Sequence, residues 1–443
     1  MRRVLIVSPS FPPVNAPDMQ RVRLSLPYLK EFGWQSHVLA IAPDSSVQVF
    51  EPRLLETVPT DVNVTRVNAL PVGLTSWFGL RNLGWRAWIS LFAAGCRLLR
   101  AEKYDVVYFS TTQFICLPMG RLWRCLFGVP FVIDLQDPWF NDYYSNNPSA
   151  ARPGGRKYLL AHVSAWLLER WTLRRCAGII SVSASYPKVL RQRYPWLKEI
   201  PMEVIPFGVD ERDFQFLSRS PVTQDLFPIG DGCAHVVSIG RGGDDLLKAV
   251  GALFTSLARL AERDSSAASR LRIHFAGTNY ASEGRAQPMF VELAHKRGVS
   301  TSFHERPWRL GYFESLQCQL DADAVLVLGS DDASYSPSKL YSVLLTGRPV
   351  VAIVLAGSLL DIRLNMTPAI HKLTYDERGT VITGMSGLLD FWRALVESPR
   401  QKRDVRAVLN TLGDTSFHAR TLTKSQVIFL ETAIAMERPI NHA

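Results

Sequence analysis

A short polar stretch follows an apolar run in the second half of the chain. The run 324–328 has the composition of a buried strand, and the chain restarts after it as Ser-Pro-Ser-Lys, residues 336–339. Ser336 is a good N-cap and the proline after it suits the first helical position, so a helix is predicted to begin here. Its first turn would present backbone N–H groups, the Ser336 and Ser338 hydroxyls and the Lys339 ammonium, which together suit a phosphate. The alternative is an ordinary capped helix with a surface lysine.

Strand and helix signals alternate around this stretch and through the first half of the chain, which predicts α/β domains with doubly wound parallel sheets. Strands are expected at 4–7, 37–42, 62–67, 106–110, 131–134 and 178–182, and again at 236–239, 273–276, 324–328 and 350–354. A polar, proline-containing stretch from about 203 to 233 separates the two series and is predicted to be the domain linker. We therefore predict two Rossmann-like domains facing a cleft, over 1–205 and 206–414, with a C-terminal helix over about 415–443 that packs back on the first.

The overall composition is that of a globular protein with a positive surface. The 443 residues are 47% hydrophobic and 20% charged, and the net charge is +10. Such a field attracts phosphates, nucleic acid or anionic lipid. The chain has no zinc-finger spacing, basic zipper or aromatic RNA-binding signature, so no nucleic-acid partner is predicted. No stretch reaches the ~20 apolar residues that span a bilayer.

Cysteine and acidic spacing exclude several kinds of site. The six cysteines are widely spread without a C-x-x-C pair, which indicates reduced residues of a cytoplasmic protein. The D-x-D triplet at 321–323 precedes its strand, at the wrong end of the sheet for a metal site, and no His and Cys spacing suits zinc. We predict neither a metal nor a cofactor.

Six segments match a known pattern in order and spacing. They are "VLIVSPSFPP", "LPYLKEFGWQSHVLAI", "FVIDLQDPW", "VIPFGVD", "VSIGRGGDD" and "PSKLYSVLLTGRPVVAI". With them the chain resembles the GT-B-fold glycosyltransferases of family 4 type over nearly its whole length. The resemblance implies a second domain that binds a nucleotide-sugar, a first domain that binds the acceptor, and sugar transfer with retention of anomeric configuration and without a required metal.

The resemblance also implies donor-binding residues. Arg241, after Gly240, stands where the family has a basic residue on the donor diphosphate, and Lys339 would be its partner. With Ser336 and Ser338 they would receive the charge that grows on the leaving diphosphate. The alternative for Arg241 is a surface residue after a glycine turn.

Two serines depart from the family pattern. The family has two glutamates eight positions apart, the second on the nucleotide ribose, and this chain has Ser334 and Ser342 there. A serine can hydrogen-bond a hydroxyl, but it is shorter and uncharged, so it would hold the ribose less firmly. Catalytic competence is therefore left open, and Asp331 and Asp332 are candidate substitutes.

The resemblance directs attention to two further loops for the acceptor side. In "DLQDPW", Asp137 could orient an acceptor hydroxyl and Trp139 could stack on a sugar; the alternative is a turn. In the loop 10–21, Asn15 and Ala16 stand in place of a glycine pair that would approach the donor phosphate. Arg21 and Arg23 could add positive charge there, but we favour solvated helix arginines.

Residues 77–103 raise the question of a membrane contact. Their apolar residues recur at helical spacing among arginines, as Trp85, Trp88, Ile89, Phe92, Cys96 and Leu99 with Arg81, Arg86, Arg97 and Arg100. This could be an interfacial helix on anionic lipid, or a helix packed on the sheet, which we favour.

The prediction is a retaining glycosyltransferase that moves a sugar from a nucleotide-sugar to a glycan or lipid-linked acceptor in surface polysaccharide biosynthesis. It would be a cytoplasmic protein. If it contacts a membrane, it would be peripheral on the inner face of the plasma membrane. The alternatives are a non-catalytic GT-B-like scaffold and a sugar-nucleotide epimerase.

Overall fold

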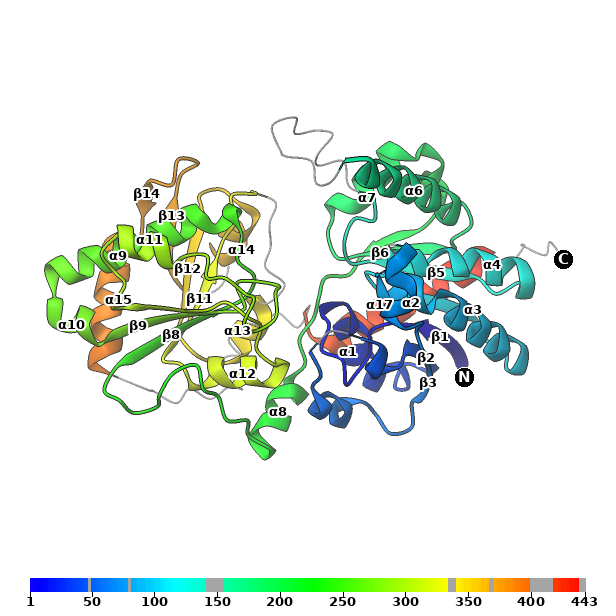
Figure 1. Ribbon diagram of the computed structural model, residues 1–443, viewed down its shortest axis with the longest axis horizontal. Coiled ribbons are helices and arrows are strands. Elements are labelled where there is room, and N and C mark those ends of the chain that lie inside the picture. The colour runs from blue at the N-terminus through cyan, green and yellow to red at the C-terminus, as the bar shows by residue number, and fades with distance from the viewer. Residues whose placement is uncertain are drawn as a thin grey trace. The chain divides into compact units, whose positions relative to one another are not determined.

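The protein consists of two compact units. The computed structural model describes residues 1–46, 49–78, 81–140, 155–333, 340–365, 370–398 and 417–437. One unit comprises Met1–Asp210 together with Ser416–Ala443, and the other comprises Glu211–Thr415 (Figure 1). The first segment of this unit thus ends at Asp210, whereas the sequence predicted that it ends at residue 205.

A seven-stranded parallel sheet forms the centre of the first unit, in the order β3-β2-β1-β4-β5-β6-β7. Its strands are β1 (Arg2–Val7), β2 (Trp34–Ile41), β3 (Asn63–Val67), β4 (Val106–Ser110), β5 (Phe131–Leu135), β6 (Gly178–Ser181) and β7 (Met202–Val204). Most residues of the inner strands are apolar because helices cover both faces of the sheet, and Asp134 in β5 is an exception.

The helices of the first unit form two layers. They are α1 (Gln20–Leu29), α2 (Val72–Thr75), α3 (Leu83–Ala101), α4 (Pro118–Phe127), α6 (Gly155–Leu173), α7 (Ser185–Arg193) and α17 (Ala419–Glu437). Buried residues of α3, α4, α6 and α7 pack on one face of the sheet, and those of α1 and α17 pack on the other. The expectation that the helix around 85–99 packs on the sheet is therefore confirmed for its inner side.

The second unit repeats this plan. Its sheet has the order β10-β9-β8-β11-β12-β13-β14 and is parallel except for the last pair. The strands are β8 (Ala234–Ile239), β9 (Leu271–Ala276), β10 (Phe303–Arg306), β11 (Ala324–Leu328), β12 (Val350–Leu355), β13 (Ile370–Tyr375) and β14 (Val381–Thr383). The two doubly wound sheets give the chain the predicted α/β fold class.

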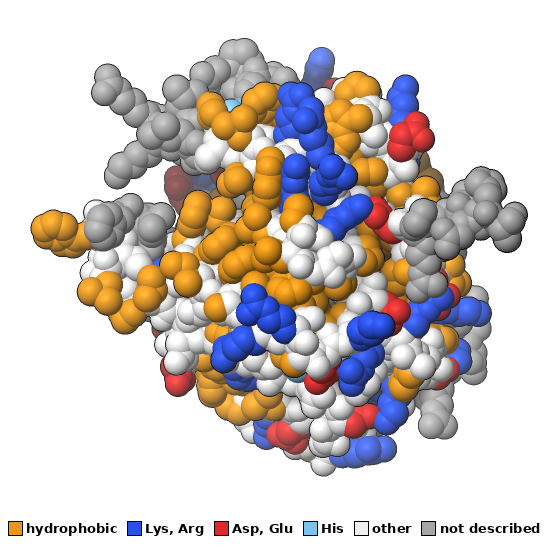
Figure 2. Space-filling model, turned by 90° about the vertical axis from the view of Figure 1, so that its right-hand side faces the viewer, with side chains coloured by type: hydrophobic (Ala, Val, Ile, Leu, Met, Phe, Trp, Pro, Cys, Tyr) orange, Lys and Arg blue, Asp and Glu red, His pale blue; other side chains and the backbone are white. Residues whose placement is uncertain are grey.

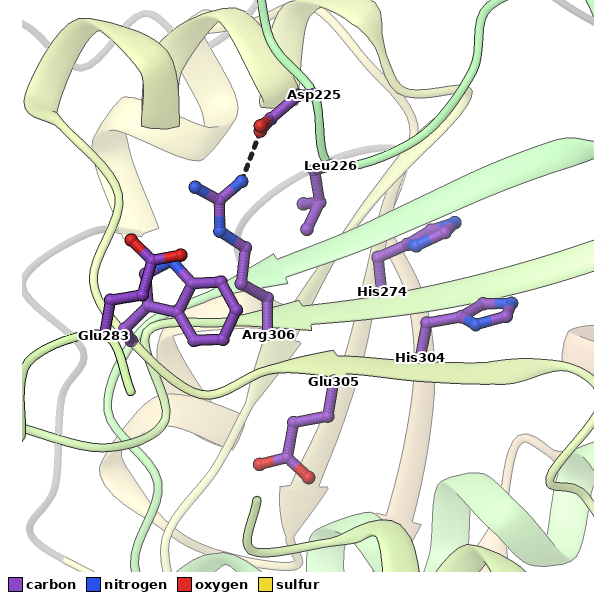
Figure 3. Close-up of a pocket in the computed structure, with 8 residues that line it drawn as sticks. Asp225, Leu226, His274, Glu283, His304, Glu305 and Arg306 are labelled. Carbon is purple, nitrogen blue, oxygen red and sulfur yellow. Dashed lines mark hydrogen bonds and ion pairs between the residues drawn. The ribbon is translucent and has the colours of Figure 1, made fainter. Parts of the chain in front are cut away.

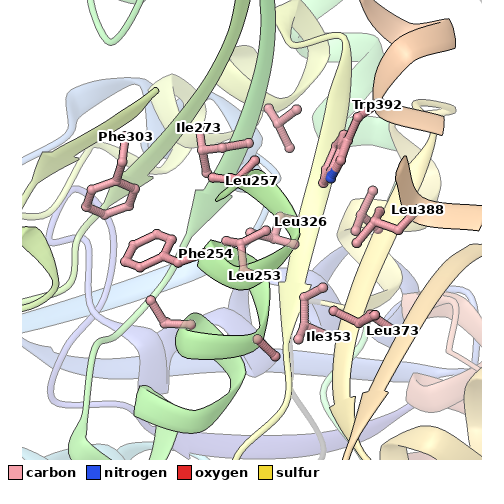
Figure 4. Close-up of a cluster of buried hydrophobic side chains, with 14 of the residues drawn as sticks. Leu253, Phe254, Leu257, Ile273, Phe303, Leu326, Ile353, Leu373, Leu388 and Trp392 are labelled. Carbon is pink, nitrogen blue, oxygen red and sulfur yellow. The ribbon is translucent and has the colours of Figure 1, made fainter. Parts of the chain in front are cut away.

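Helices cover both faces of the second sheet as well. They are α8 (Glu211–Arg219), α9 (Leu247–Arg263), α10 (Ser265–Arg270), α11 (Val291–Lys296), α12 (Tyr312–Asp321), α13 (Leu340–Leu345), α14 (Leu359–Asn365) and α15 (Met385–Glu397). One core joins α9 and α15 to the sheet through residues such as Phe254, Leu326 and Trp392 (Figure 4). A second core lies on the opposite face under α12, α13 and α14.

The stretch predicted to be the domain linker contains a helix. α8 begins at Glu211, immediately after the unit boundary, and buries Phe214 and Leu217. The Tyr312 hydroxyl at the start of α12 donates to Asp213 at 2.5 Å. The boundary between the units thus lies within the stretch 203–233, and a nine-residue amphipathic helix follows it.

Each sheet has one point where the strand order reverses. In the first sheet it lies between β1 and β4, and in the second between β8 and β11. At such a point the connections leave in opposite directions and open a crevice beyond the carboxyl ends of the two strands, which is where α/β sheets bind ligands. The loops after these four strands are therefore the places to examine for chemistry.

Candidate functional site

A glycine-rich loop leaves β8 at the reversal point of the second sheet. Gly240 N–H donates to Ala276 O at 3.0 Å, and Gly242 N–H donates to Thr278 O at 2.9 Å. A Cβ on Gly242 would lie 2.7 Å from Thr278 O, and one on Gly243 would lie 2.3 Å from Asp245 Oδ1. Larger residues would collide at both positions, so close packing of the loop accounts for the glycines at 242 and 243.

Arg241 is held in this loop by an acidic partner. Its Nη1 and Nη2 donate to Asp245 Oδ1 and Oδ2 at 2.8 and 2.7 Å. Hydrogen bonds from Arg241 lower the pKa of the Asp245 carboxyl below its ordinary value. Such a two-point pair fixes the plane of the guanidinium. Sequence reasoning singled out Arg241 and missed Asp245, although an opposite charge four residues away was a usable signal.

Asp245 also connects the exits of the two strands. The Ser330 hydroxyl, just after β11, donates to Asp245 Oδ2 at 2.7 Å, and Asp331 N–H donates to Asp245 O at 2.9 Å. Asp331 Oδ2 in turn lies 3.0 Å from Lys248 Nζ. The edge thus combines two cations with two carboxylates in a half-buried setting, and Asp331, proposed as a substitute for a glutamate, is engaged by Lys248.

The remaining predicted donor residues lie close by in sequence. Ser334, Ser336, Ser338 and Lys339 lie outside the described residues. Ser342 is half-buried on α13, which begins at Leu340. Its role on a ribose stays a prediction.

The corresponding edge of the first unit is organised around a buried ion pair. Arg21 Nε lies 2.7 Å from Asp134 Oδ2, with the two side chains 6% and 0% exposed. Arg21 Nη2 also donates to Ile205 O at 2.6 Å. The interpretation of Arg21 and Arg23 as solvated helix arginines was wrong, since both are buried. Arg21 is buried because its partner sits on a central strand far away in sequence.

A second buried acid, Asp18, completes this polar group. Asp18 Oδ2 accepts from Thr111 Oγ1, Thr112 Oγ1 and Thr112 N–H, each at 3.2 Å. The Gln136 side-chain amide donates to Asp18 O at 2.9 Å and to Asp134 Oδ2 at 3.3 Å. Burial raises the pKa of Asp18. The group spans the reversal point between β1 and β4, and its sequence signal was only a run of polar residues after β4.

Asp137 and Trp139 follow β5 at the same edge. Asp137 is exposed on one side, while partial burial and the nearby Asp18 raise the pKa of its carboxyl. Trp139 stacks on Phe114 with the ring centroids 5.9 Å apart and the planes 13° apart. One face of the indole is therefore occupied, which restricts sugar stacking to the other.

Asn15 lies in the loop after β1. Its side-chain amide donates to Glu51 Oε2 at 2.9 Å, and its backbone N–H donates to Val49 O at 2.8 Å. These contacts tie the loop to a neighbouring segment of the same unit.

Comparison with known proteins agrees with this architecture. Residues 20–208 match the family model described as a glycosyl transferase 4-like domain. Among solved structures, the N-terminal domain of Candida albicans trehalose-6-phosphate phosphatase is similar with a TM-score of 0.60 and 13% identity, covering 98% of this chain and 97% of that one. A glycosyltransferase from Rickettsia africae matches with a TM-score of 0.54, 13% identity and coverage of 97% and 98%. The UDP-forming trehalose-phosphate synthase of Burkholderia xenovorans matches with a TM-score of 0.53, 12% identity and full coverage of both chains.

The chain has the GT-B fold, and its residues 20–208 are similar to a glycosyl transferase 4-like domain. No curated protein matches it in sequence.

This GT-B chain has a pocket of about 330 Å³ in its second unit, beside β9 and β10 (Figure 3). The lining residues are Asp225, Leu226, His274, Glu283, His304, Glu305, Arg306 and Trp308. Burial lowers the pKa of His274 to about 3, so its ring is neutral near pH 7. None of the predicted site residues that the structure describes lines this pocket.

Among the residues that the structure describes, no group of three or more His, Cys, Asp or Glu side chains could hold a metal ion. The Asp323 carboxylate of the D-x-D triplet accepts from His235 N–H at 2.7 Å and thus has a structural contact.

Proposed function

We propose that the protein is a retaining glycosyltransferase that transfers a sugar from a nucleotide-sugar to a glycan or lipid-linked acceptor in surface polysaccharide biosynthesis. The observation that carries the proposal is the Gly240–Gly243 loop with Arg241 fixed by Asp245, at the reversal point of the second sheet. The glycosyl transferase 4-like match supports the reaction class. Solved neighbours bound to UDP-2-fluoro glucose and to glucose-6-phosphate support a nucleotide-sugar donor and a sugar acceptor.

The donor would bind the second unit. Its diphosphate would contact the loop Gly240–Gly243, the Arg241 guanidinium and the residues Ser336, Ser338 and Lys339. As the bond to the sugar breaks, negative charge grows on the diphosphate, and fixed positive groups lower the barrier because they need no rearrangement. One such fixed hydrogen-bond donor lowers the activation free energy by about 3 kcal/mol. Asp245 would be a positioning residue that sets the guanidinium before the donor arrives.

The acceptor would bind the first unit. Asp137, whose pKa is raised, would accept a hydrogen bond from the attacking hydroxyl, and Trp139 would offer the ring face that Phe114 leaves uncovered. Arg21 and Asn15 would act indirectly, since both are engaged with protein groups. In a retaining transfer the hydroxyl attacks from the side on which the diphosphate leaves, so the diphosphate oxygen can take its proton. We propose that this chemistry needs no metal or cofactor.

A nucleotide panel tests the proposal. One nucleoside diphosphate should raise the melting temperature of the protein by mass action, and the matching nucleotide-sugar should release it when acceptor is added. Arg241→Ala should abolish the shift, whereas Arg259→Ala, an exposed arginine on α9, should leave it unchanged. EDTA should not affect turnover.

The serines at 334 and 342 favour one further candidate, a GT-B-like scaffold without activity. A scaffold would show neither the nucleotide shift nor release of diphosphate. An epimerase of the same fold would isomerise the donor without any acceptor, which analysis of the sugar product would reveal.

A further inference from the structure

The outer surface of the first unit carries unusually many exposed apolar side chains on adjacent segments. We call this the outer apolar surface; it comprises Leu70, Val72, Leu74, Trp77, Trp85, Ile89, Leu126, Val163, Leu167 and Trp171. Trp77 is 93% exposed and Ile89 is 72% exposed. Figure 2 views the side of the unit on which α3 and α4 lie, and it shows hydrophobic side chains gathered in one area with Lys and Arg among and around them.

Local packing joins these residues into one surface. Val163, Leu167 and Trp171 are four residues apart and share one face of α6. α4 packs against both α3 and α6. The segment before α3 is attached to it, since Arg86 Nε donates to Leu70 O at 2.7 Å and Leu70 N–H donates to Arg86 O at 3.0 Å. The same α3 that packs on the sheet therefore turns Trp85 and Ile89 outward.

The charges on this layer have one sign. α3 and α4 contain no Asp or Glu, and the single acid of α6, Glu169, is buried 2.9 Å from Arg193. The exposed or half-exposed arginines that the structure describes in these helices and in the turn after α6 are Arg97, Arg100, Arg121, Arg124, Arg170, Arg174 and Arg175. Of these, Arg124 is paired with Glu437 on α17. Four lie over aromatic rings: Arg100 over Phe127 at 5.7 Å, Arg121 over Trp171 at 4.3 Å, Arg170 over Trp166 at 5.6 Å and Arg174 over Trp196 at 5.8 Å.

The combination of apolar area and unbalanced positive charge selects the partner. A second copy would bring the same arginines against these ones, and like charges across an interface cost several kcal/mol. An anionic bilayer accepts both features, because tryptophans prefer the headgroup region and arginines bind lipid phosphates. No described helix is long and apolar enough to cross a membrane, so the contact would be peripheral.

We propose that the outer apolar surface docks the first unit on an anionic lipid bilayer. Helix α3 also connects this surface to the proposed acceptor side. Trp88 Nε1 on α3 donates to Ile115 O at 3.0 Å, in the short helix Phe114–Cys116 whose Phe114 stacks on Trp139. Docking would thus bring a lipid-linked acceptor next to Trp139. This use rests on the proposed function, whereas lipid binding itself does not.

Vesicle flotation tests the docking with the full chain and no donor present. The protein should float with vesicles that contain 30% phosphatidylglycerol and stay behind with pure phosphatidylcholine. Arg97→Gln with Arg100→Gln should weaken partitioning about thirtyfold. Ile89→Ser with Leu167→Ser should weaken it at least about tenfold. The matched control is Ile382→Ser with Ile428→Ser, two isoleucines 55% and 54% exposed on β14 and α17, and it should float like the wild type.

The docking proposal is overturned if the wild type and both surface variants float equally well. It is also overturned if the wild type does not float with anionic vesicles. Light scattering gives a third decisive outcome: a wild-type dimer that the Ile89 and Leu167 variant converts to monomer would assign the surface to self-association. If a serine variant does not fold, the arginine variant, which changes only exposed charges, decides alone. If the wild type shows the nucleotide shift but does not float with anionic vesicles, the docking proposal is refuted and the proposed function stands.

Discussion

Replacing Arg21 by methionine should destabilise the first unit strongly. The substitution leaves Asp134 buried without the charge that faces it at 2.7 Å. Breaking a buried pair from one side costs about 3–5 kcal/mol. Asp134 Oδ2 keeps hydrogen bonds from Ser110 at 2.9 Å and Tyr108 at 3.2 Å, so we expect the lower end, about 3 kcal/mol.

Calorimetry can measure this change in the transition that belongs to the first unit. For a unit of this size, about 3 kcal/mol corresponds to a fall in melting temperature of about 6–12 °C. The double variant Arg21→Met with Asp134→Asn should recover much of the loss, because the uncompensated charge is gone. Arg97→Gln, an exposed arginine on α3, should change the melting temperature by less than about 2 °C.

A fall of less than about 2 °C for Arg21→Met would refute the assignment of Arg21 to a buried structural pair. If acceptor turnover were lost at the same time, Arg21 would instead contact substrate directly. Failure of the double variant to recover stability would show that Arg21 acts through its backbone contacts at Ile205 and Pro206.

The remaining predictions concern single side chains. Asp245→Asn should weaken nucleotide binding about tenfold, seen as a smaller thermal shift, because the paired arginine loses its fixed plane; an unchanged shift would contradict this. The pKa of His274 is about 3 when folded, below the ~6.5 of the unfolded chain, so the unfolded state takes up the proton first as the pH falls. Stability of the second unit should therefore drop by about 2 kcal/mol from neutral pH to pH 5 through this group, and His274→Phe should flatten that slope in urea titrations. Gly95→Ala places a Cβ 2.1 Å from the Trp123 ring and should cost about 1–3 kcal/mol, whereas Gly251→Ala meets nothing within 4 Å in its helix and should stabilise by about 0.5–1 kcal/mol. Thermal melts of both glycine variants distinguish packing from helix propensity.

Much of the fold could be predicted because its strands are buried on both faces and therefore read as short apolar runs. β4, β5, β11 and β12 are of this kind and were expected within a residue or two. Shorter or half-polar strands carried too little signal. β10, with the sequence Phe-His-Glu-Arg, gains its place from pairing with β9, which local composition does not reveal.

The site was harder to predict because its contacts are long-range. Arg21 looked like a surface residue of α1, and only the folded sheet brings it to Asp134 in β5. Asp18 lies before α1 and depends on threonines after β4. Arg241 could be singled out from its glycine loop, but the bond to Asp245 that orients it becomes visible only with coordinates.

The helix α17 has a consequence for how the protein is made. It supplies Phe429, Leu430 and Ala433 to the core of the first unit, and it lies against Gly178, where a Cβ would come within 2.8 Å of the Phe429 ring. During synthesis, these side chains leave the ribosome after all of the second unit. The unit that is translated first is therefore completed last, and until then the face of its sheet that α1 and α17 share is only partly covered, so apolar side chains there are exposed to the ribosome-bound chain and to chaperones. The second unit, a single continuous segment, can finish folding earlier.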